Sequence, residues 1–378
     1  MRLLIRWLLI PCLLFLMTLY MCRSNDTKSY QRKVKHFVRN ISENSCAARL
    51  QKRILPMSVL LIDLDYLKGF NEKPCAWNES KPIKIGIDAK YKSKKLQLKN
   101  FKVYYYINNS RKDFFSFDMD GVRRLIPRRF DTKWIGKIEI PVDVERFEEF
   151  WKRSKFIDCL GLDMHRNMAE KPYSDALPTV DILARLRDDL LDSGMFPSLN
   201  SGTFLGWYRE CTVIPHTTDL DIAVSKDKFN PEYIEKTLNG ESEFRLIRKL
   251  GKIEDSFELT VTSRKKFFFQ SGTNIDIFIM YEFIEDGALK YYYISGLAGD
   301  GTKYRYTYPI YDPWCVGEMH DHFFWVPCSP ETLIPAEYGP NWHLDHPSSE
   351  YSWNSSPFNV KEAGKFTEEE LKKYYVTY

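Results

Sequence analysis

The longest apolar stretch of the chain lies at its start, where residues 7–22 form a run of 16 mostly apolar residues behind Arg2 and Arg6. As a helix this run is about 24 Å long, which is short for an average bilayer of about 30 Å and closer to the thickness of the early secretory membranes. The positive charge before it favours a cytosolic tail at 1–6, a signal-anchor at 7–22 and a luminal remainder. The alternative is a cleaved signal peptide, although no small-x-small cleavage site follows the run.

Patterns typical of a folded domain begin near residue 50, after a polar and basic segment at 23–50 that reads as a stem. Buried strands are predicted at 58–64 and 84–88, and an aromatic strand at 101–107. Apolar residues at helical spacing predict a helix over 144–155. Residues 51–160 are therefore expected to form a smaller, mixed α/β luminal domain.

The second half of the chain, residues 161–378, predicts another α/β domain with a mixed sheet. An amphipathic helix is expected over 179–193, with Gly194 as its C-terminal signal. Residues 257–262 and 273–281 alternate apolar and polar positions, as half-buried strands do. In the second of these strands Asp276 stands on the face opposite Ile275 and Ile277.

Composition excludes several classes of protein. Hydrophobic residues make up 44% of the chain, and 55 Lys and Arg residues stand against 51 Asp and Glu residues. The hydrophobic fraction excludes wholesale disorder, and the near balance of charge gives no reason to expect a nucleic-acid partner. Five N-x-S/T sequons are present, and Asn40, Asn78 and Asn108 are the expected glycosylation sites in a lumen.

Eight cysteines are too few for a disulfide scaffold, but six of them lie beyond the predicted anchor. An oxidising lumen permits three disulfides among these six, and we expect Cys315 and Cys328 to pair because they close a short loop. The pairing of the other four stays open. A zinc site is the competing interpretation, since His320 and His322 lie between the two cysteines.

Asp219 and Asp221 are the first candidates for chemistry. Side chains two apart on a strand share a face at about 7 Å, so Leu220 and Ile222 can face a core while both carboxylates project together. Two ionised carboxylates at that separation repel by about 2 kcal/mol at an effective dielectric of 20. A hard divalent cation, Mg²⁺ or Mn²⁺, reverses that repulsion.

Neighbouring residues extend this candidate site. Gly202 and Thr203 precede a predicted helical run at 205–210 and are suited to binding phosphate through free backbone amides. With Asp276 as a third carboxylate, the set has the composition of a nucleotidyl-transfer site, in which metal ions clamp the attacking and leaving oxygens at phosphorus. Arg209 is a candidate contact for the donor phosphates, and His216 a candidate proton shuttle.

These residues also resemble a known family. Residues 202–211 (GTFLGWYREC), 214–217 (IPHT) and 219–221 (DLD) are similar to the LicD/fukutin family. Residues 251–256 (GKIEDS), Asp276, 326–328 (VPC), 338–339 (YG), 356–357 (SP) and 359–360 (NV) match the same pattern in the same order. The resemblance is strong over about residues 180–360 and weaker before them.

The resemblance implies a nucleotidyltransferase-type fold in the Golgi membrane, with the catalytic domain in the lumen. It implies a metal-dependent transfer of ribitol 5-phosphate from CDP-ribitol to an O-mannosyl-type glycan, as on dystroglycan, with release of CMP. Bacterial relatives instead transfer phosphocholine, so another phosphoalcohol is an alternative, and a catalytically inactive Golgi scaffold is a second. A CDP-activated donor, a glycoprotein glycan and other Golgi glycosyltransferases are the expected partners.

Overall fold

The computed structural model describes residues 34–36, 45–53, 55–72, 74–94, 98–166, 175–265, 273–312 and 314–378. The chain divides into two compact units: the first runs up to Gly121 and from Ile126 to Trp151, and the second contains Val122–Leu125 and Lys152–Tyr378. Among the described residues no helix is long and apolar enough to cross a membrane. The expected anchor at 7–22 and most of the expected stem lie outside the described residues.

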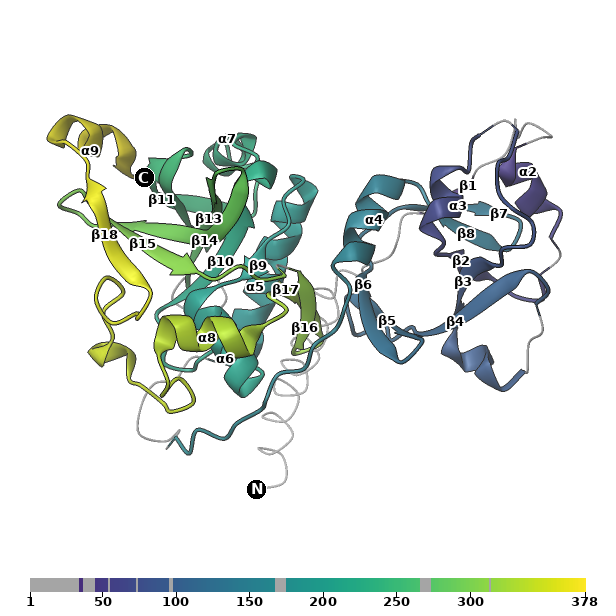
Figure 1. The fold of residues 1–378 in the computed structure, drawn as a ribbon, viewed down its shortest axis with the longest axis horizontal. Coiled ribbons are helices and arrows are strands. Elements are labelled where there is room, and N and C mark those ends of the chain that lie inside the picture. The colour runs from purple at the N-terminus through teal and green to yellow at the C-terminus, as the bar shows by residue number, and fades with distance from the viewer. Residues whose placement is uncertain are drawn as a thin grey trace, which may run out of the picture. The chain divides into compact units, whose positions relative to one another are not determined.

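The first unit is built on a mixed sheet whose strands follow the order β1-β7-β8-β2-β3-β4-β5-β6 (Figure 1). The strands are β1 (Val34–His36), β2 (Val59–Leu61), β3 (Ile83–Asp88), β4 (Phe101–Ile107), β5 (Phe114–Met119), β6 (Val122–Pro127), β7 (Thr132–Ile135) and β8 (Ile138–Pro141). The helices are α2 (Cys46–Gln51), α3 (Leu64–Lys68), the 3-10 helix η1 (Ala89–Lys94) and α4 (Val144–Lys152).

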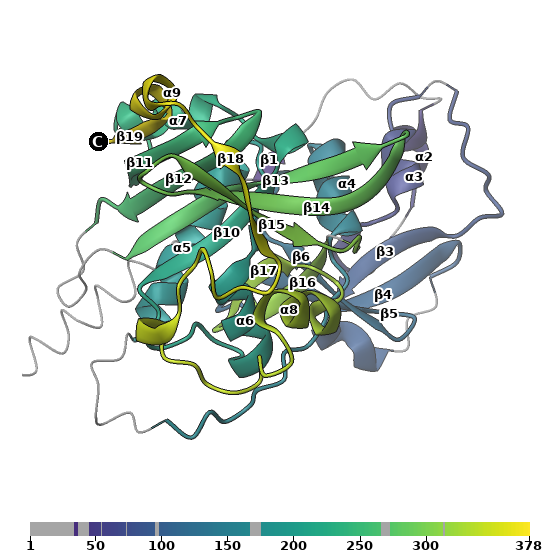
Figure 2. The same ribbon diagram turned by 60° about the vertical axis from the view of Figure 1, so that its left-hand side comes forward.

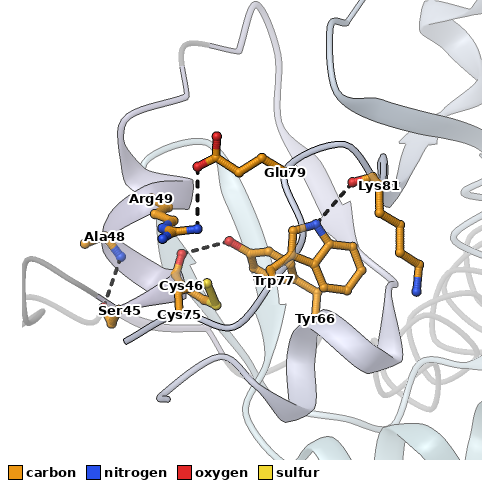
Figure 3. Close-up of a disulfide and its surroundings, with 9 residues drawn as sticks. All are labelled: Ser45, Cys46, Ala48, Arg49, Tyr66, Cys75, Trp77, Glu79 and Lys81. Carbon is orange, nitrogen blue, oxygen red and sulfur yellow. Dashed lines mark hydrogen bonds and ion pairs between the residues drawn. A yellow bond between two sulfur atoms is a disulfide. The ribbon is translucent and has the colours of Figure 1, made fainter. Parts of the chain in front are cut away.

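A disulfide between Cys46 and Cys75 fastens α2 to the segment that follows α3 (Figure 3). Beside it the Tyr66 hydroxyl donates to the Cys46 carbonyl at 2.8 Å, and the Tyr66 and Trp77 rings meet edge to face. These contacts order a segment with little regular structure. Asn78 follows Trp77 and is exposed, as is Asn108 at the end of β4, so both sequons are accessible, whereas Asn40 lies outside the described residues.

The second unit contains a larger sheet whose main path is β16-β17-β9-β10-β13-β12-β11-β19, with β14, β15 and β18 continuing from β13. Its strands are β9 (Ser198–Leu199), β10 (Asp219–Ser225), β11 (Phe244–Lys252), β12 (Asp255–Ser263), β13 (Asn274–Glu285), β14 (Ala288–Leu297), β15 (Thr302–Tyr308), β16 (Cys315–Met319), β17 (His322–Val326), β18 (Val360–Lys365) and β19 (Tyr375–Thr377). Its helices are α5 (Ala176–Asp192), α6 (Ser201–Glu210), η2 (Lys226–Lys228), α7 (Glu232–Leu238), α8 (Pro330–Tyr338), η3 (Ser348–Glu350) and α9 (Glu368–Tyr374).

The core of this unit includes the apolar face of β10 and β13. Leu220, Ile222 and Val224 of β10 stand beside Ile275, Ile277 and Ile279 of β13, and all six side chains are buried. The apolar stripe of α5, including Leu183, Leu186 and Leu190, belongs to the same cluster. The alternation along β10 and β13 therefore sends Asp219, Asp221 and Asp276 to the other face.

Helices α6 and α8 lie side by side near the start of β10 (Figure 2). A disulfide between Cys159 and Cys211 ties the residue after α6 to the segment that enters the second unit. Cys315 is joined to Cys328, as its short loop predicts. This pair removes both thiolates from the alternative zinc site, while His320 contacts the Thr212 hydroxyl and His322 the Asp181 carboxylate.

Most of the expected elements are present with shifted ends. The predicted strand at 58–64 is shorter, because Asp63 caps α3 and ends the extended chain at Ile62. The helix expected at 179–193 begins three residues earlier, where the Asp175 carboxylate accepts the Leu177 amide, and it ends before Gly194, whose φ is 81°. Strand β12 differs most, since both of its faces are buried from Ser256 to Thr262 instead of one.

The close approach of Trp207 to Gly317 yields a prediction about the packing of α6. The Trp207 indole donates to the Glu318 carbonyl, and a methyl group on Gly317 would lie 2.3 Å from the ring. We expect Gly317→Ala to lower the free energy of unfolding by about 1–3 kcal/mol, because overpacking forces the helix to shift. Gly299→Ala is the control, since nothing lies within 4 Å of its added methyl. Urea unfolding curves that coincide for the two variants would contradict this account.

Candidate active site

The polar face of the central sheet gathers carboxylates from three neighbouring strands. Strands β10 and β13 are parallel, and their register places Asp221 directly beside Asp276. Strand β12 is antiparallel to β13 and sets Thr260 beside Asp276, with Glu258 two residues along on the same face. Asp219 lies two residues before Asp221, so the structure brings together the three carboxylates that the sequence predicts and adds Glu258.

Asp221 is held at the beginning of α6. The Gly202 amide donates to its carboxylate at 3.2 Å, and the Asp221 amide donates to the Thr203 hydroxyl at 2.7 Å. A side chain on Gly202 would crowd this contact, since an added Cβ lies 3.3 Å from the carboxylate. The positive end of the helix therefore faces Asp221 and stabilises negative charge there.

This arrangement changes the expected role of Gly202 and Thr203. The two residues belong to the first turn of α6, which begins at Ser201, rather than to a separate turn before the helix. Thr203 is 3% exposed and its hydroxyl already accepts from Asp221. Their contact to phosphate is thus replaced by a contact to the carboxylate at the centre of the site.

Burial and mutual repulsion raise the pKa of every carboxyl group in this cluster. The pKa of Asp221 is raised well above its usual range, first by burial and then by the charges of Asp219, Asp276, Glu337 and Glu258. Burial raises the pKa of Asp276 to about 6. Burial and the nearby Asp276 charge raise the pKa of Glu258 to about 8. The cluster therefore lacks enough positive charge to balance its carboxylates.

Arg248 of β11 supplies a positive charge to this cluster. Its guanidinium pairs with Glu258 at 3.1 Å and lies 3.6 Å from an Asp276 oxygen. It also donates to the Thr260 hydroxyl, and that hydroxyl in turn donates to Asp276 at 2.5 Å. Arg248 thus orients Asp276 through Thr260.

Helix α8 adds a fifth carboxylate, Glu337, which lies among tyrosines of α8 and β15. Glu337 is 4% exposed and accepts the Tyr308 hydroxyl at 2.8 Å, and burial raises its pKa. The hydroxyl of Tyr338 lies 4.0 Å from the position of a Cβ on Gly202, which puts α8 against the first turn of α6. Asn200, Ser201, Tyr308, Glu337 and Tyr338 share one small cavity between the two helices.

The donor chemistry of the cluster fits a hard divalent cation, because carboxylate oxygens are the ligands that Mg²⁺ and Mn²⁺ prefer. Across the described parts of the chain, no three His, Cys, Asp or Glu side chains are placed to hold a metal ion as they stand. Asp219, Asp221 and Asp276 thus share a face without forming a finished coordination shell. Mg²⁺ is usually held by one or two carboxylates together with substrate phosphates, and the Asp219–Asp221 pair meets that need.

Arg209 does not face the cluster as a free phosphate ligand. It is 2% exposed, its guanidinium pairs with Glu210, and it donates to the carbonyls of Trp342 and Leu344 at 3.1 and 2.9 Å. Arg166 binds Glu210 from the other side and also binds Asp345. Arg209 therefore anchors the segment after α8 to the end of α6.

His216, like Arg209, contacts the segment that follows α8. One ring nitrogen contacts the Ser348 hydroxyl at 2.8 Å and the other contacts the Asp345 carboxylate at 3.0 Å. Because both nitrogens have partners, the imidazole has no free site for shuttling a proton to substrate. The role that fits these contacts is to position the segment around 345–348 beside the 211–217 loop.

Sequence reasoning missed Glu258, Glu337 and Arg248. The signal that could have found Glu258 is the polar series Glu258, Thr260 and Thr262 inside a strand that also carries large apolar residues. A strand with an exposed polar face shows the same alternation, so only burial of both faces separates the two cases. Glu337 and Arg248 reach the site through tertiary packing and have no local sequence signal.

Comparison with known proteins finds two known domains in this chain. Residues 37–158 match the W02B3.4-like N-terminal domain, and residues 197–329 match the LicD/FKTN/FKRP nucleotidyltransferase domain. The uncharacterised protein W02B3.4 of Caenorhabditis elegans is 45% identical over 88% of this chain and 84% of its own length. The uncharacterised protein T07A5.1 of the same organism is 38% identical over 88% of the chain and 87% of its length.

A more distant relative has a named activity. The mouse protein called ribitol-5-phosphate transferase FKTN is 30% identical over 60% of this chain and 47% of its own length. No solved structure is similar to this chain. The second unit thus contains a match to a nucleotidyltransferase domain, and this part of the chain carries a partly buried carboxylate cluster. The chain belongs to the LicD/FKTN family and, within it, to the proteins that carry the W02B3.4-like N-terminal domain.

The raised pKa values predict how stability depends on pH. The folded protein keeps protons on Asp276 and Glu258 that the unfolded chain releases, so their stabilising contribution is complete below about pH 4 and is lost as pH rises through about 6 and 8. In EDTA, the free energy of unfolding should fall by a few kcal/mol, an order-of-magnitude figure, between pH 5 and pH 8.5.

Glu258→Gln should reduce this fall, because the amide is neutral at every pH. Glu282→Gln, on the exposed end of β13, is the matched control and should leave the slope unchanged. Urea unfolding at a series of pH values measures both slopes. Equal slopes for wild type and Glu258→Gln would mean that Glu258 does not share the cluster.

Proposed function

We propose that this protein is a glycan-modifying transferase that moves ribitol 5-phosphate from CDP-ribitol to an O-mannosyl-type glycan, as on dystroglycan, with release of CMP. The observation that carries the proposal is the partly buried carboxylate cluster of Asp219, Asp221 and Asp276 at the start of α6, inside a LicD/FKTN/FKRP nucleotidyltransferase domain. The name of the FKTN relative supports the choice of cargo. The Golgi membrane and its other glycosyltransferases are the proposed location and partners.

In this proposal Asp219, Asp221 and Asp276 form the unit that would hold Mg²⁺ or Mn²⁺. The ion, when bound, neutralises the charge of the donor pyrophosphate. The α6 amide holds Asp221 in place and favours its ionised form, against the burial and the neighbouring carboxylates that raise its pKa. The tyrosines and Glu337 of the neighbouring cavity limit the access of water to the reacting phosphorus.

The proposed reaction is a direct displacement at phosphorus. An acceptor hydroxyl oxygen forms a bond to the phosphorus that carries ribitol, and the bond from that phosphorus to the bridging oxygen of the donor breaks. CMP leaves with the bridging oxygen, and the acceptor proton passes to a carboxylate. Asp276 fits this last role, since its pKa of about 6 lies near neutrality and Thr260 orients it.

Substitution of the central carboxylate tests the site. Asp221→Asn keeps an acceptor for the Gly202 amide, so the fold should survive, while CMP release at saturating Mn²⁺ should fall by about a hundredfold or more. In EDTA the variant should melt at or above the temperature of wild type, because one repelling charge is gone. The Asp219→Asn/Asp221→Asn double variant should be about as inactive as either single variant.

Asp227→Asn is the matched control, since Asp227 is an exposed carboxylate just after β10. A panel of CDP-ribitol, CDP-choline and CDP-glycerol identifies the cargo, with the mass of the glycan product as the second readout. Turnover with CDP-choline alone would establish the phosphocholine alternative. Wild-type turnover by a normally folded Asp221→Asn would refute the assigned site. If no donor is consumed by wild type, the inactive scaffold becomes the better account.

The proposed topology can be tested separately. Residues 7–22 should act as the signal-anchor, with residues 23–378 in the lumen, because Arg2 and Arg6 favour the cytosolic side. Protease added to intact vesicles should spare everything after the anchor, and detergent should abolish the protection. Digestion without detergent would reverse the proposed orientation, and loss of residues 1–22 from the mature protein would show a cleaved signal.

A further inference from the structure

A second groove lies on the sheet formed by β14, β15 and β18. It has a volume of about 580 Å³, which is within the range of small-ligand sites. Its lining includes Tyr291, Arg305, Thr307 and Lys361, with Glu362 beside them. Tyr308 also lines the groove and is shared with the cavity beside Glu337, whereas none of the residues just named takes part in the carboxylate cluster described above.

Two cations face each other directly in this groove. The antiparallel register of β15 and β18 pairs Arg305 with Lys361, so the two side chains project from the same face of the sheet as cross-strand neighbours. Like charges in this position repel and destabilise a strand pair. An anion placed between them would turn this repulsion into attraction.

Neighbouring cations on the same strands are paired, whereas these two are not. Lys303 binds Asp255 at 2.7 Å, and Lys365 binds Asp300 at 2.8 Å. Neither Arg305 nor Lys361 forms an ion pair with a carboxylate in the described part of the chain, even though Glu362 is adjacent. The Arg305 Nε atom is buried and has no hydrogen-bond partner among the described residues. A buried donor without a partner is costly, so the charge of Arg305 is poorly compensated by the protein itself.

Stacked aromatic rings lie beside the cations, and one of them, Tyr291, lines the groove. The ring of Tyr291 stacks on Phe283 at 4.5 Å, and that of Tyr293 stacks on Tyr281 at 5.0 Å. The Arg305 guanidinium lies over the Tyr293 ring at 4.2 Å. Flat aromatic surface next to hydrogen-bond donors suits the apolar face of a sugar ring.

The groove and the carboxylate cluster occupy opposite faces of the sheet. Asp276 and Tyr281 are five residues apart on β13, and an odd separation on a strand changes the face. Tyr281 pairs with Tyr293 of β14, and Tyr293 pairs with Thr307 of β15, so all three side chains project from one face of the sheet. Arg305 is two residues before Thr307 and projects from the same face. A ligand can therefore bind the groove without displacing anything at the cluster.

We propose that this groove is a binding site for an anionic sugar, meaning a sugar residue that carries a phosphate or a carboxylate. Arg305 and Lys361 take the negative group, and Tyr291 packs against the ring. The proposal rests on the groove itself and does not depend on the proposed transfer reaction.

Ligand binding to the full-length protein in detergent tests the proposal. Saturation-transfer NMR and calorimetry with glucose 6-phosphate, glucuronate, glucose and inorganic phosphate supply the affinities. At least one of the two charged sugars should bind with a Kd in the millimolar range or below, at least tenfold more tightly than glucose and inorganic phosphate. Binding should weaken as salt is raised, since it depends on charge.

Arg305→Gln and Lys361→Gln should each weaken that binding at least tenfold, while Lys365→Gln, whose ammonium is already paired with Asp300, should not. Without ligand, Lys361→Gln should also melt higher than wild type, because one of the two facing cations is gone. Asp221→Asn should bind the charged sugar like wild type, which separates this site from the catalytic one. Equal binding by Arg305→Gln and wild type, or binding of inorganic phosphate as tight as that of the sugars, would overturn the proposal.

Discussion

The contact between Asp221 and the first turn of α6 is the constraint on which the site depends. A carboxylate surrounded by Asp219, Asp276, Glu258 and Glu337 would be expected to take up a proton. The Gly202 amide opposes this by donating to the carboxylate, and the helix terminus adds its partial positive charge. The contact needs a residue without a side chain at position 202, because a Cβ would lie against the carboxylate.

Much of the surrounding packing fixes α6 so that this contact persists. Trp207 packs flat against Gly317 and bonds to the backbone of β16. At the other end, Arg209 binds the segment after α8, and Cys211 is joined to Cys159. A helix held along its length cannot withdraw its first turn from Asp221 without breaking one of these contacts. The rigidity of α6 is thus part of the chemistry of the cluster.

The local elements and the central carboxylates were predictable from sequence because both follow from short-range patterns. Alternation along 273–281 put Asp276 opposite an apolar face, and the Asp219–Asp221 spacing put two carboxylates on one face. The roles of Arg209 and His216 were not predictable, because their partners, Trp342, Leu344, Asp345 and Ser348, lie more than 120 residues away. Glu258 was missed because a buried polar face and an exposed one have the same alternation.

The parallel register of β10 and β13 constrains how the chain between them can change. Asp221 and Asp276 meet only because they are register partners, although a hairpin of β11 and β12 separates them in sequence. Insertions within the connecting loops leave that pairing intact. A single residue inserted inside either strand, before its aspartate, would turn the carboxylate into the apolar core and an isoleucine or leucine toward the polar face. Insertions and deletions among related sequences should therefore lie in the loops, while the residue spacing within these two strands stays fixed.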